Sequence, residues 1–379
     1  VINFEYRFMH SDIIKLASAL LTSFVLTYMF IPSIIKVAKI KHLFDSPNER
    51  KSHHEVIPTL GGIGIFGGFM ISLCLFAKFH PANGMRYILA ALCFMFMLGA
   101  KDDIVELVAN KKFIGQIFAA SIIVILGDIR LTSMYGLFGI SYISDPFSYV
   151  FSIVTIIFII NAFNLIDGIN LLSGSIGILM AVAFGSWFFV YGFYDYAILA
   201  TAMSGSILAF LKYNYTPAKI FMGDSGSLCI GLLASVLAIQ FIEQNEIVLR
   251  SGNSMDITIT AAPAMAIAVL IIPIFDTLRV FTMRLLAKKS PFQADRSHIH
   301  HRLIDLGMSH IHATYVLLTV NIVFIVIIYF LQSWGNLFLI LFEFGLAIAL
   351  AYVLFSIPIN KKSKKIVEKV MPLSIDSVG

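Results

Sequence analysis

Two aspartates stand side by side at the edge of an apolar segment. Asp102 and Asp103 directly follow the sequence LGAK. Adjacent carboxylates repel one another and raise each other's pKa, and a divalent cation removes that penalty. Mg²⁺ prefers oxygen ligands, and it takes one or two carboxylates beside water and substrate phosphates. We therefore expect a magnesium site here, and a pair of aspartates that only marks the water interface is the alternative.

A third carboxylate lies in the motif FMGDSGS, which covers residues 221–227. Gly223 and Gly226 flank Asp224 and let the backbone approach another group closely. The start of the apolar helix that follows offers free N–H groups to an anion. The motif predicts Asp224 as a further metal ligand, and a plain turn with a helix cap is the alternative.

Amide and carboxylate side chains recur every three residues in NAFNLIDGIN. They are Asn161, Asn164, Asp167 and Asn170. On a helix, steps of three keep such residues roughly on one face. A polar stripe with both donors and acceptors suits the edge of a ligand better than a metal alone, although helix capping around Gly168 is the alternative.

A basic, histidine-rich loop reads DRSHIHHRL, from residue 295 to residue 303. It has no cysteine partner, and H-x-H-H does not place ligands at the spacing of helical zinc sites. Imidazole and guanidinium groups bind and neutralise phosphoryl oxygens. We therefore expect cationic phosphate contacts from this loop, whose candidate residues are Arg296, His298, His300, His301 and Arg302.

Asp276 and Arg279 stand three residues apart inside an apolar run. At this spacing on a helix they can pair, which makes charge inside a membrane tolerable. Structural pairing and the lining of a pocket are both open for these two residues.

The elements that carry these motifs are membrane helices. The chain has 379 residues, of which 59% are apolar and only 13% are charged, whereas soluble domains have about 25% charged residues. Continuous rather than alternating apolar runs favour helices over an outer-membrane barrel, and three isolated cysteines offer neither a disulfide framework nor a cysteine-based zinc site. We predict an all-α, polytopic membrane protein with about eleven spanning helices and no cleavable signal peptide. The apolar runs lie near residues 12–35, 60–79, 87–100, 113–127, 147–162, 172–193, 196–211, 227–242, 258–286, 313–331 and 336–358.

Lysine and arginine predict the orientation, because they are retained on the cytoplasmic side. With the N-terminus outside, twenty of them fall in inner segments and six in outer ones. The chain is then one transmembrane catalytic domain, residues 1–358, with a basic cytoplasmic tail at 359–379. All the polar motifs fall on the cytoplasmic face, including DSPNERKSHHEVIPTLGG (45–62), which lies between the first two apolar runs. No long basic run suggests nucleic acid.

In this order, the five motifs resemble those of the polyprenyl-phosphate N-acetylhexosamine-1-phosphate transferases, over about residues 12–358. DRSHIHHRL is similar to the branch that starts O-antigen, common-antigen and teichoic-acid linkage units. The peptidoglycan branch usually has a PIHHH-like loop instead. Asn170 and Leu171 depart from the family pattern, where Asp and Gly are common.

The resemblance implies that undecaprenyl phosphate attacks a UDP-N-acetylhexosamine and that UMP leaves. The similarity of DRSHIHHRL favours UDP-GlcNAc as this donor. It implies an enzyme of the bacterial inner membrane that uses Mg²⁺, for which Mn²⁺ can substitute. Asp224 would bind the metal, and Asp102 and Asp103 would position it or deprotonate the lipid phosphate. Asn161, Asn164, Asp167 and Asn170 would line the nucleotide pocket, with Phe221 stacked on uracil. Contacts to phosphate or sugar are then expected from Lys51, His53, Lys112, Arg296, His298, His300, His301 and Arg302, with His300, His301 and Asp167 also counted as catalytic.

Two alternatives remain at this point. A secondary transporter would also have about eleven helices and intramembrane charges, but it often places its polar site near the bilayer midplane, whereas these motifs crowd one face. The phospho-MurNAc-pentapeptide transferase of peptidoglycan synthesis is the alternative within the enzyme class. The sugar epimer, the lipid length and the oligomeric state stay open, with a homodimer as one option.

Overall fold

The computed structural model describes residues 2–43, 57–79, 84–252, 258–289 and 297–359. Within these ranges the chain is helical and forms no strand beyond one isolated bridge between Ser133 and Tyr142, which confirms the predicted all-α class. The predicted tail, from residue 360 on, lies outside the described part. The helices are α1 (Ile2–Lys41), α2 (Gly61–Phe76), α3 (Met85–Ile104), α4 (Ala109–Ser121), η2 (Ile122–Leu126), η3 (Leu137–Gly139), α5 (Asp145–Ile166), α6 (Leu172–Val190), α7 (Tyr194–Asn214), α8 (Asp224–Arg250), α9 (Ala262–Val269), α10 (Ile271–Leu286), α11 (Ile299–Asp305), α12 (His310–Leu331), η4 (Gln332–Trp334) and α13 (Asn336–Ser356).

The length and apolar character of the helices make this a multi-pass membrane protein. Eight of the described helices are long and apolar enough to cross a membrane, or nine if the bent pair α9–α10 is one span. The predicted apolar runs all fall in helices, but α2 has only 16 residues and α3 ends in the charged residues Lys101, Asp102 and Asp103. The count of eleven spanning helices therefore stays a prediction.

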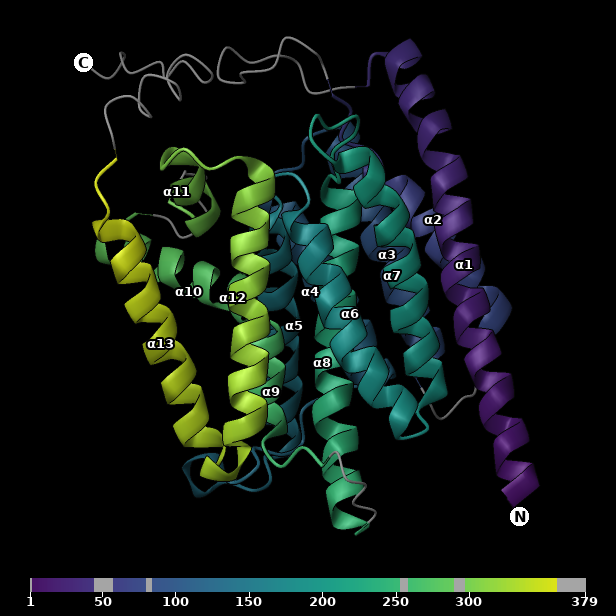
Figure 1. Cartoon of the computed structure of the whole chain (residues 1–379), viewed down its shortest axis with the longest axis vertical. Helices are drawn as coiled ribbons and strands as arrows, with labels where there is room; N and C mark the ends of the chain where they lie inside the picture. The colour runs from purple at the N-terminus through teal and green to yellow at the C-terminus, as the bar shows by residue number, and fades with distance from the viewer. Residues whose placement is uncertain (1, 44–56, 80–83, 253–257, 290–296, 360–379) are drawn as a thin grey trace.

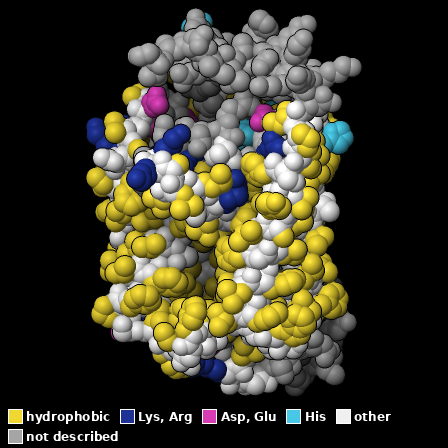
Figure 2. Space-filling model, turned by 90° about the vertical axis from the view of Figure 1, so that its left-hand side faces the viewer, with side chains coloured by type: hydrophobic (Ala, Val, Ile, Leu, Met, Phe, Trp, Pro, Cys, Tyr) yellow, Lys and Arg dark blue, Asp and Glu magenta, His cyan; other side chains and the backbone are white. Residues whose placement is uncertain are grey.

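Helix α8 forms the centre of the bundle (Figure 1). Its sequence is apolar on every side from Leu228 to Ile239, as expected of a helix that is surrounded by others. In its most apolar window 94% of the residues are buried, against 22% in α1 and in α13. The outer helices therefore present apolar side chains outward, as Figure 2 shows around the middle of the molecule.

The expected single run at 258–286 is broken, and its two halves α9 and α10 meet at an angle of 80°. Pro273 lacks the N–H that would bond to the carbonyl of Val269, four residues earlier, and this bends a helix. Asn321 of α12 satisfies the freed backbone: its Nδ2 donates to the carbonyl oxygens of Ala268 at 2.9 Å and Val269 at 3.2 Å. The break therefore follows from the sequence and is held by a neighbouring helix.

The polar motifs gather at one end of the bundle. Helices α3 and α5 end there, α4 and α8 begin there, and α11 lies across it, while α1 begins at the opposite end (Figure 1). On the face that Figure 2 shows, most lysine and arginine side chains also lie toward this end. The arrangement brings together residues that are far apart in the sequence.

Candidate active site

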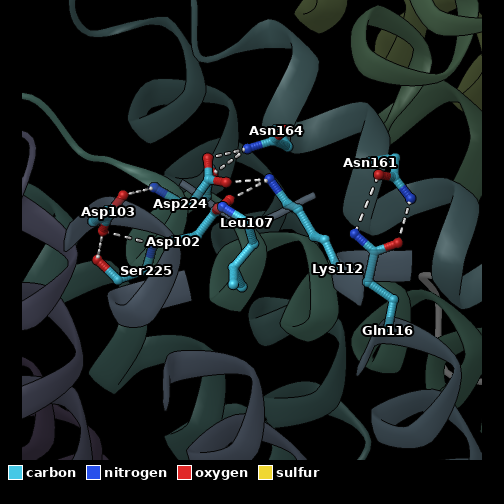
Figure 3. A network of polar contacts seen from close by, with 10 residues as sticks. Asp102, Asp103, Leu107, Lys112, Gln116, Asn161, Asn164, Asp224 and Ser225 are labelled. Atoms are coloured by element: carbon cyan, nitrogen blue, oxygen red, sulfur yellow. Dashed lines mark hydrogen bonds and ion pairs between the residues drawn. The ribbon is translucent and has the colours of Figure 1, made fainter. Parts of the chain in front are cut away.

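Three charged side chains from three helices form the centre of the site (Figure 3). The ammonium group of Lys112, on α4, is 3.2 Å from Oδ2 of Asp102, on α3, and it also bonds Oδ2 of Asp224, the first residue of α8. The three side chains are 11–24% exposed. Both carboxylates thus point at one position, and a single cation there can interact with the two of them.

Asp103 faces the other way and caps the start of α8. Its Oδ1 accepts from the backbone N–H of Asp224 at 2.6 Å, and its Oδ2 accepts from the N–H of Ser225 at 3.0 Å and the hydroxyl of Ser225 at 2.5 Å. A carboxylate at a helix N-terminus satisfies free N–H groups and complements the helix dipole. Asp103 therefore fixes the position of Asp224 and does not join the pair around Lys112.

Close backbone packing makes this geometry attainable. A Cβ at Gly99 of α3 would lie 2.6 Å from the backbone N of Ser225, and a Cβ at Gly62 of α2 would lie 2.1 Å from the backbone N of Gly226. Only glycine allows so close an approach. Asp102 is fixed as well, because its Oδ1 accepts from the N–H of Leu107 at 2.6 Å.

Of the predicted polar stripe, two members lie on one helix. Asn164 of α5 donates from Nδ2 to Oδ1 of Asp224 at 2.7 Å and to the hydroxyl of Ser227 at 3.0 Å. Asn161 instead exchanges two amide hydrogen bonds with Gln116 of α4, at 2.7 and 3.2 Å. The stripe thus begins as expected, and Asn164 reaches Asp224, which together with Asp102 and Lys112 forms what we call the acidic centre.

The expectation of a helical face that continues to Asn170 is wrong, because α5 ends at Ile166. Asn170 is buried, and its side-chain NH₂ donates to the Thr216 hydroxyl at 3.1 Å, while its carbonyl accepts from Thr314 at 3.1 Å. The next residue, Leu171, has a left-handed φ of 72°, a conformation that favours glycine. Both residues shape the turn between α5 and α6.

Asp167 follows the end of α5 beside the acidic centre. Burial, together with the charges of Asp224 and Asp103, raises the pKa of Asp167 well above its usual range. A carboxyl whose pKa is shifted in this way is typical of a functional site.

His300 of α11 lies against the same turn. A Cβ at Gly168 would be 2.3 Å from its Nε2, and that buried nitrogen has no hydrogen-bond partner among the described residues. Burial lowers the pKa of His300 to about 3, so its imidazole is neutral at physiological pH. This differs from the cation that the sequence predicted, because the sequence does not show that the side chain is enclosed.

Of the other residues in DRSHIHHRL, His298 and His301 lie beside His300, whereas Arg302 bonds the end of another helix. The rings of His300 and His301 are 4.2 Å apart between centroids, and those of His298 and His300 are stacked at 5.5 Å. Arg302 instead donates to the carbonyl oxygens of Phe355, at 3.1 Å, and Ile357 at the end of α13. In that position its charge complements the C-terminal end of the α13 dipole.

Phe221 lies on the loop that enters α8. Its N–H donates to the carbonyl of Pro58 at 2.8 Å, and its own carbonyl accepts from Gly61 at 2.9 Å. The ring is half-buried, and its stacking on a base stays a prediction. Three further candidates, Lys51, His53 and Arg296, lie outside the described residues.

Sequence reasoning missed several supporting residues. Gln116 stands four residues after Lys112 on α4, a spacing that places both on one helix face, and this signal could have linked it to the site. Ser225 and Ser227 are polar members of FMGDSGS, but only the structure shows that they bond Asp103 and Asn164. No role was predicted for His310, but its Nδ1 accepts from the backbone N–H of Asn170 at 3.4 Å.

The carboxylate oxygens of the site suit a hard divalent cation that takes only a few ligands from the protein. No group of three or more His, Cys, Asp or Glu side chains converges as a metal cage within the part of the chain that the structure describes. Two carboxylates, Asp102 and Asp224, do converge on one cationic group. Mg²⁺ is commonly bound by one or two carboxylates plus substrate phosphates, so the oxygen donors present suit this ion.

Comparison with known proteins finds one matching family and several similar enzymes. The model of Glycosyl transferase family 4 matches residues 85–242. The chain is 32% identical over 320 residues to the decaprenyl-phosphate N-acetylglucosaminephosphotransferase of Mycobacterium leprae, with 78% of each chain covered. It is 33% identical over 322 residues to the protein of the same name from Mycolicibacterium smegmatis, with 78% of this chain and 77% of the relative covered. It is 28% identical over 347 residues to the undecaprenyl-phosphate alpha-N-acetylglucosaminyl 1-phosphate transferase of Escherichia coli K12, with 88% and 90% covered.

Proposed function

Because this chain belongs to the polyprenyl-phosphate N-acetylglucosamine-1-phosphate transferases, we propose that it transfers GlcNAc-1-phosphate from UDP-GlcNAc to undecaprenyl phosphate. An oxygen of the lipid phosphate attacks the phosphorus that carries the sugar, and a new P–O bond forms. The P–O bond to UMP breaks, and UMP leaves with the bridging oxygen. The product is an undecaprenyl diphospho-GlcNAc, on which a cell-surface polysaccharide can be built.

The observation that carries this proposal is the convergence of Asp102, Asp224 and Lys112 at one end of a membrane bundle. The reaction brings the charges of three phosphates together, so that its main physical problem is repulsion. Positioned cations and dipoles are the usual means of stabilising phosphoryl transfer. The site supplies one positioned cation, Lys112, and two convergent carboxylates that can hold a metal cation.

We further propose Mg²⁺ as the metal, held by Asp224 with Asp102 as the second carboxylate. When bound, the ion would neutralise the diphosphate and stabilise the transferring phosphoryl group. Asp103 contributes by fixing the start of α8, so that Asp224 stays in place. Asn164 donates to Asp224 and thereby orients its carboxylate. The ion would take the position of the Lys112 ammonium group between the two carboxylates, and the displaced lysine would then pair with the phosphates.

The acceptor needs little help to become a nucleophile. The second pKa of a phosphate monoester is about 6, so most of the lipid phosphate is already a dianion at neutral pH. A strong general base is therefore not required of Asp102 or Asp103. Their proposed contribution is electrostatic and positional.

The donor's uridine is proposed to lie between the half-buried Phe221 and the turn at Asp167. An aromatic face stacks on a base, and a directed donor or acceptor reads its edge. Asp167 would supply a hydrogen-bonding group there. His300, neutral and with a buried unpartnered Nε2, adds a second polar atom at the same turn.

The site is proposed to face the cytoplasm, where nucleotide sugars are made. Twenty lysines and arginines fall in the predicted inner segments and six in the outer ones, and positive residues are retained on the cytoplasmic side. The α13 helix ends at the same end of the bundle as the site (Figure 1). An acceptor in the inner leaflet and a donor from the cytosol can then meet there.

A donor panel tests the proposed specificity. Purified protein in detergent would receive undecaprenyl phosphate with UDP-GlcNAc, UDP-GalNAc or UDP-MurNAc-pentapeptide, and UMP release would be measured. We expect the highest kcat/KM with UDP-GlcNAc, and we expect Phe221→Ala to raise the KM for it more than it lowers kcat. Equal turnover of the pentapeptide donor would reassign the branch, and an unchanged KM would remove Phe221 from the nucleotide pocket.

A further inference from the structure

A buried carboxylate outside the acidic centre holds the histidine loop. Asp276 of α10 is 1% exposed. It accepts three hydrogen bonds: from Nη2 of Arg279 at 2.8 Å, from the backbone N–H of Ile299 at 3.1 Å, and from the ring Nδ1 of His298 at 2.9 Å. Two of these three partners belong to DRSHIHHRL. Asp276 therefore links a membrane helix directly to the loop that carries the histidines.

The contact fixes the start of α11. Ile299 is the first residue of that helix and His298 is its N-cap, whose own side chain makes no capping bond. Asp276 supplies the missing acceptor from another helix, which satisfies a free N–H group as a cap does. Arg279 adds a second attachment, because its guanidinium also donates to the carbonyl of Ser297.

The same contact selects one form of His298. A carboxylate accepts hydrogen bonds, so Nδ1 of His298 must carry the proton, and Nε2 is the nitrogen left for another partner. The His298 ring stacks on His300. Nε2 of His300 in turn lies against the backbone at Gly168, next to Asp167. A continuous set of contacts thus runs from Asp276 to the proposed donor site.

We propose that Asp276 is a positioning residue for the transfer reaction: through His298 and the start of α11 it holds His300 at the Gly168 turn. The proposal rests on the proposed function insofar as that turn belongs to the donor site. A buried carboxylate inside a membrane helix is costly unless it is paired, and Asp276 is paired with Arg279 and with two residues of the loop. A residue that only paired with Arg279 would not need to bond the loop twice as well.

Asp276→Asn tests the proposal because it keeps the shape and removes the charge. In a Ser-His-Asp triad the same exchange leaves the geometry intact and favours the wrong histidine tautomer. Loss of a group that orients a metal-binding side chain typically costs about 10–100-fold in affinity or activity, and we take this as the scale for a group that orients His298. We expect kcat for UMP release to fall by about that factor, with the KM for UDP-GlcNAc changed by less than about threefold and the Tm close to wild type.

Two further variants separate positioning from stability. Asp276→Glu keeps the carboxylate and should recover most of the lost kcat. Glu343→Gln is the matched control: Glu343 of α13 is also fully buried, and it lies on a helix that contributes nothing to the acidic centre. It should leave kcat unchanged. Wild-type turnover by folded Asp276→Asn, or equal losses in Asp276→Asn and Asp276→Glu with normal KM and Tm, would overturn the proposal.

A spectroscopic measurement does not depend on turnover. In the wild-type protein labelled with ¹⁵N-histidine, NMR should show the His298 ring protonated at Nδ1, with the signal assigned by its absence in His298→Gln. A ring protonated only at Nε2 would overturn the proposal even if Asp276→Asn fails to fold. Failure of the proposed function has a different signature, since the wild type would then release no UMP while the tautomer remained as expected.

Discussion

Replacing Lys112 by methionine removes the ammonium group that bridges the two convergent carboxylates. Methionine keeps a similar length and an apolar stem, so that the lost charge is the main change. Asp102 and Asp224 are then left facing one another, 11% and 24% exposed, with no cation between them. We expect this variant to be less stable than wild type without metal and to bind Mg²⁺ more tightly.

The magnitude follows from the burial of the pair. Removing one partner of a buried ion pair costs about 3–5 kcal/mol, and partial solvation of these side chains reduces this to about 2 kcal/mol. A loss of this size would lower the Tm of a domain of about 150–250 residues by roughly 4–8 °C, and the fall should be smaller in this longer chain. A metal that no longer competes with an ammonium group should bind about tenfold more tightly, which adds about 1.4 kcal/mol of stabilisation at saturation.

Thermal unfolding of purified protein in detergent, with EDTA or with increasing Mg²⁺, measures both effects. Lys212→Met is the matched control, because Lys212 of α7 bonds the Tyr28 hydroxyl at 3.0 Å, away from the acidic centre. The Mg²⁺-induced rise in Tm should be larger in Lys112→Met than in wild type and unchanged in Lys212→Met. An equal rise in all three proteins would refute the reasoning that Lys112 and the metal share one position.

Three further predictions concern the same end of the molecule. Asp103→Asn should lower the Tm in differential scanning fluorimetry and reduce UMP release, since an amide cannot accept all three bonds at the start of α8; a normal Tm would show that the cap is dispensable. Gly168→Ala should reduce kcat because its Cβ would lie 2.3 Å from Nε2 of His300, whereas Gly345→Ala, with nothing within 4 Å, should not; equal kcat values would contradict the contact. In a background without native cysteines, an impermeant thiol reagent on intact cells should label Ser141→Cys and not Asn110→Cys, and the reverse pattern would invert the proposed orientation.

Much of the architecture could be predicted from the sequence, because the length and apolar composition of a segment identify it as a membrane helix. The gathering of Asp102, Lys112 and Asp224 at one end followed from counting alternate crossings. The break before Pro273 was not predicted. Apolar composition alone does not distinguish a bent helix from a straight one, and only the proline indicates the bend.

Side-chain direction was harder to predict than position along the chain. Asp102 and Asp103 are adjacent and chemically identical, yet one faces Lys112 and the other caps α8. Arg302 was expected at the phosphates and instead holds the end of α13. His300 was expected to be a cation and is enclosed. Each of these outcomes depends on which neighbouring helix packs against the residue, and spacing within one segment contains no such information.

The central claim is an enzyme whose Asp224 holds a divalent metal for phosphoryl transfer. UMP release from UDP-GlcNAc and undecaprenyl phosphate by purified protein in detergent tests it most directly, because a transporter has no second compartment there and no reason to release UMP. EDTA should abolish the release, and Mg²⁺ or Mn²⁺ should restore it. Asp224→Asn should lower kcat by at least about 10²–10³-fold, while Asp128→Asn, a 72% exposed residue at the opposite end, should not. Ordinary activity in folded Asp224→Asn, or no UMP release by the wild type, would contradict the account.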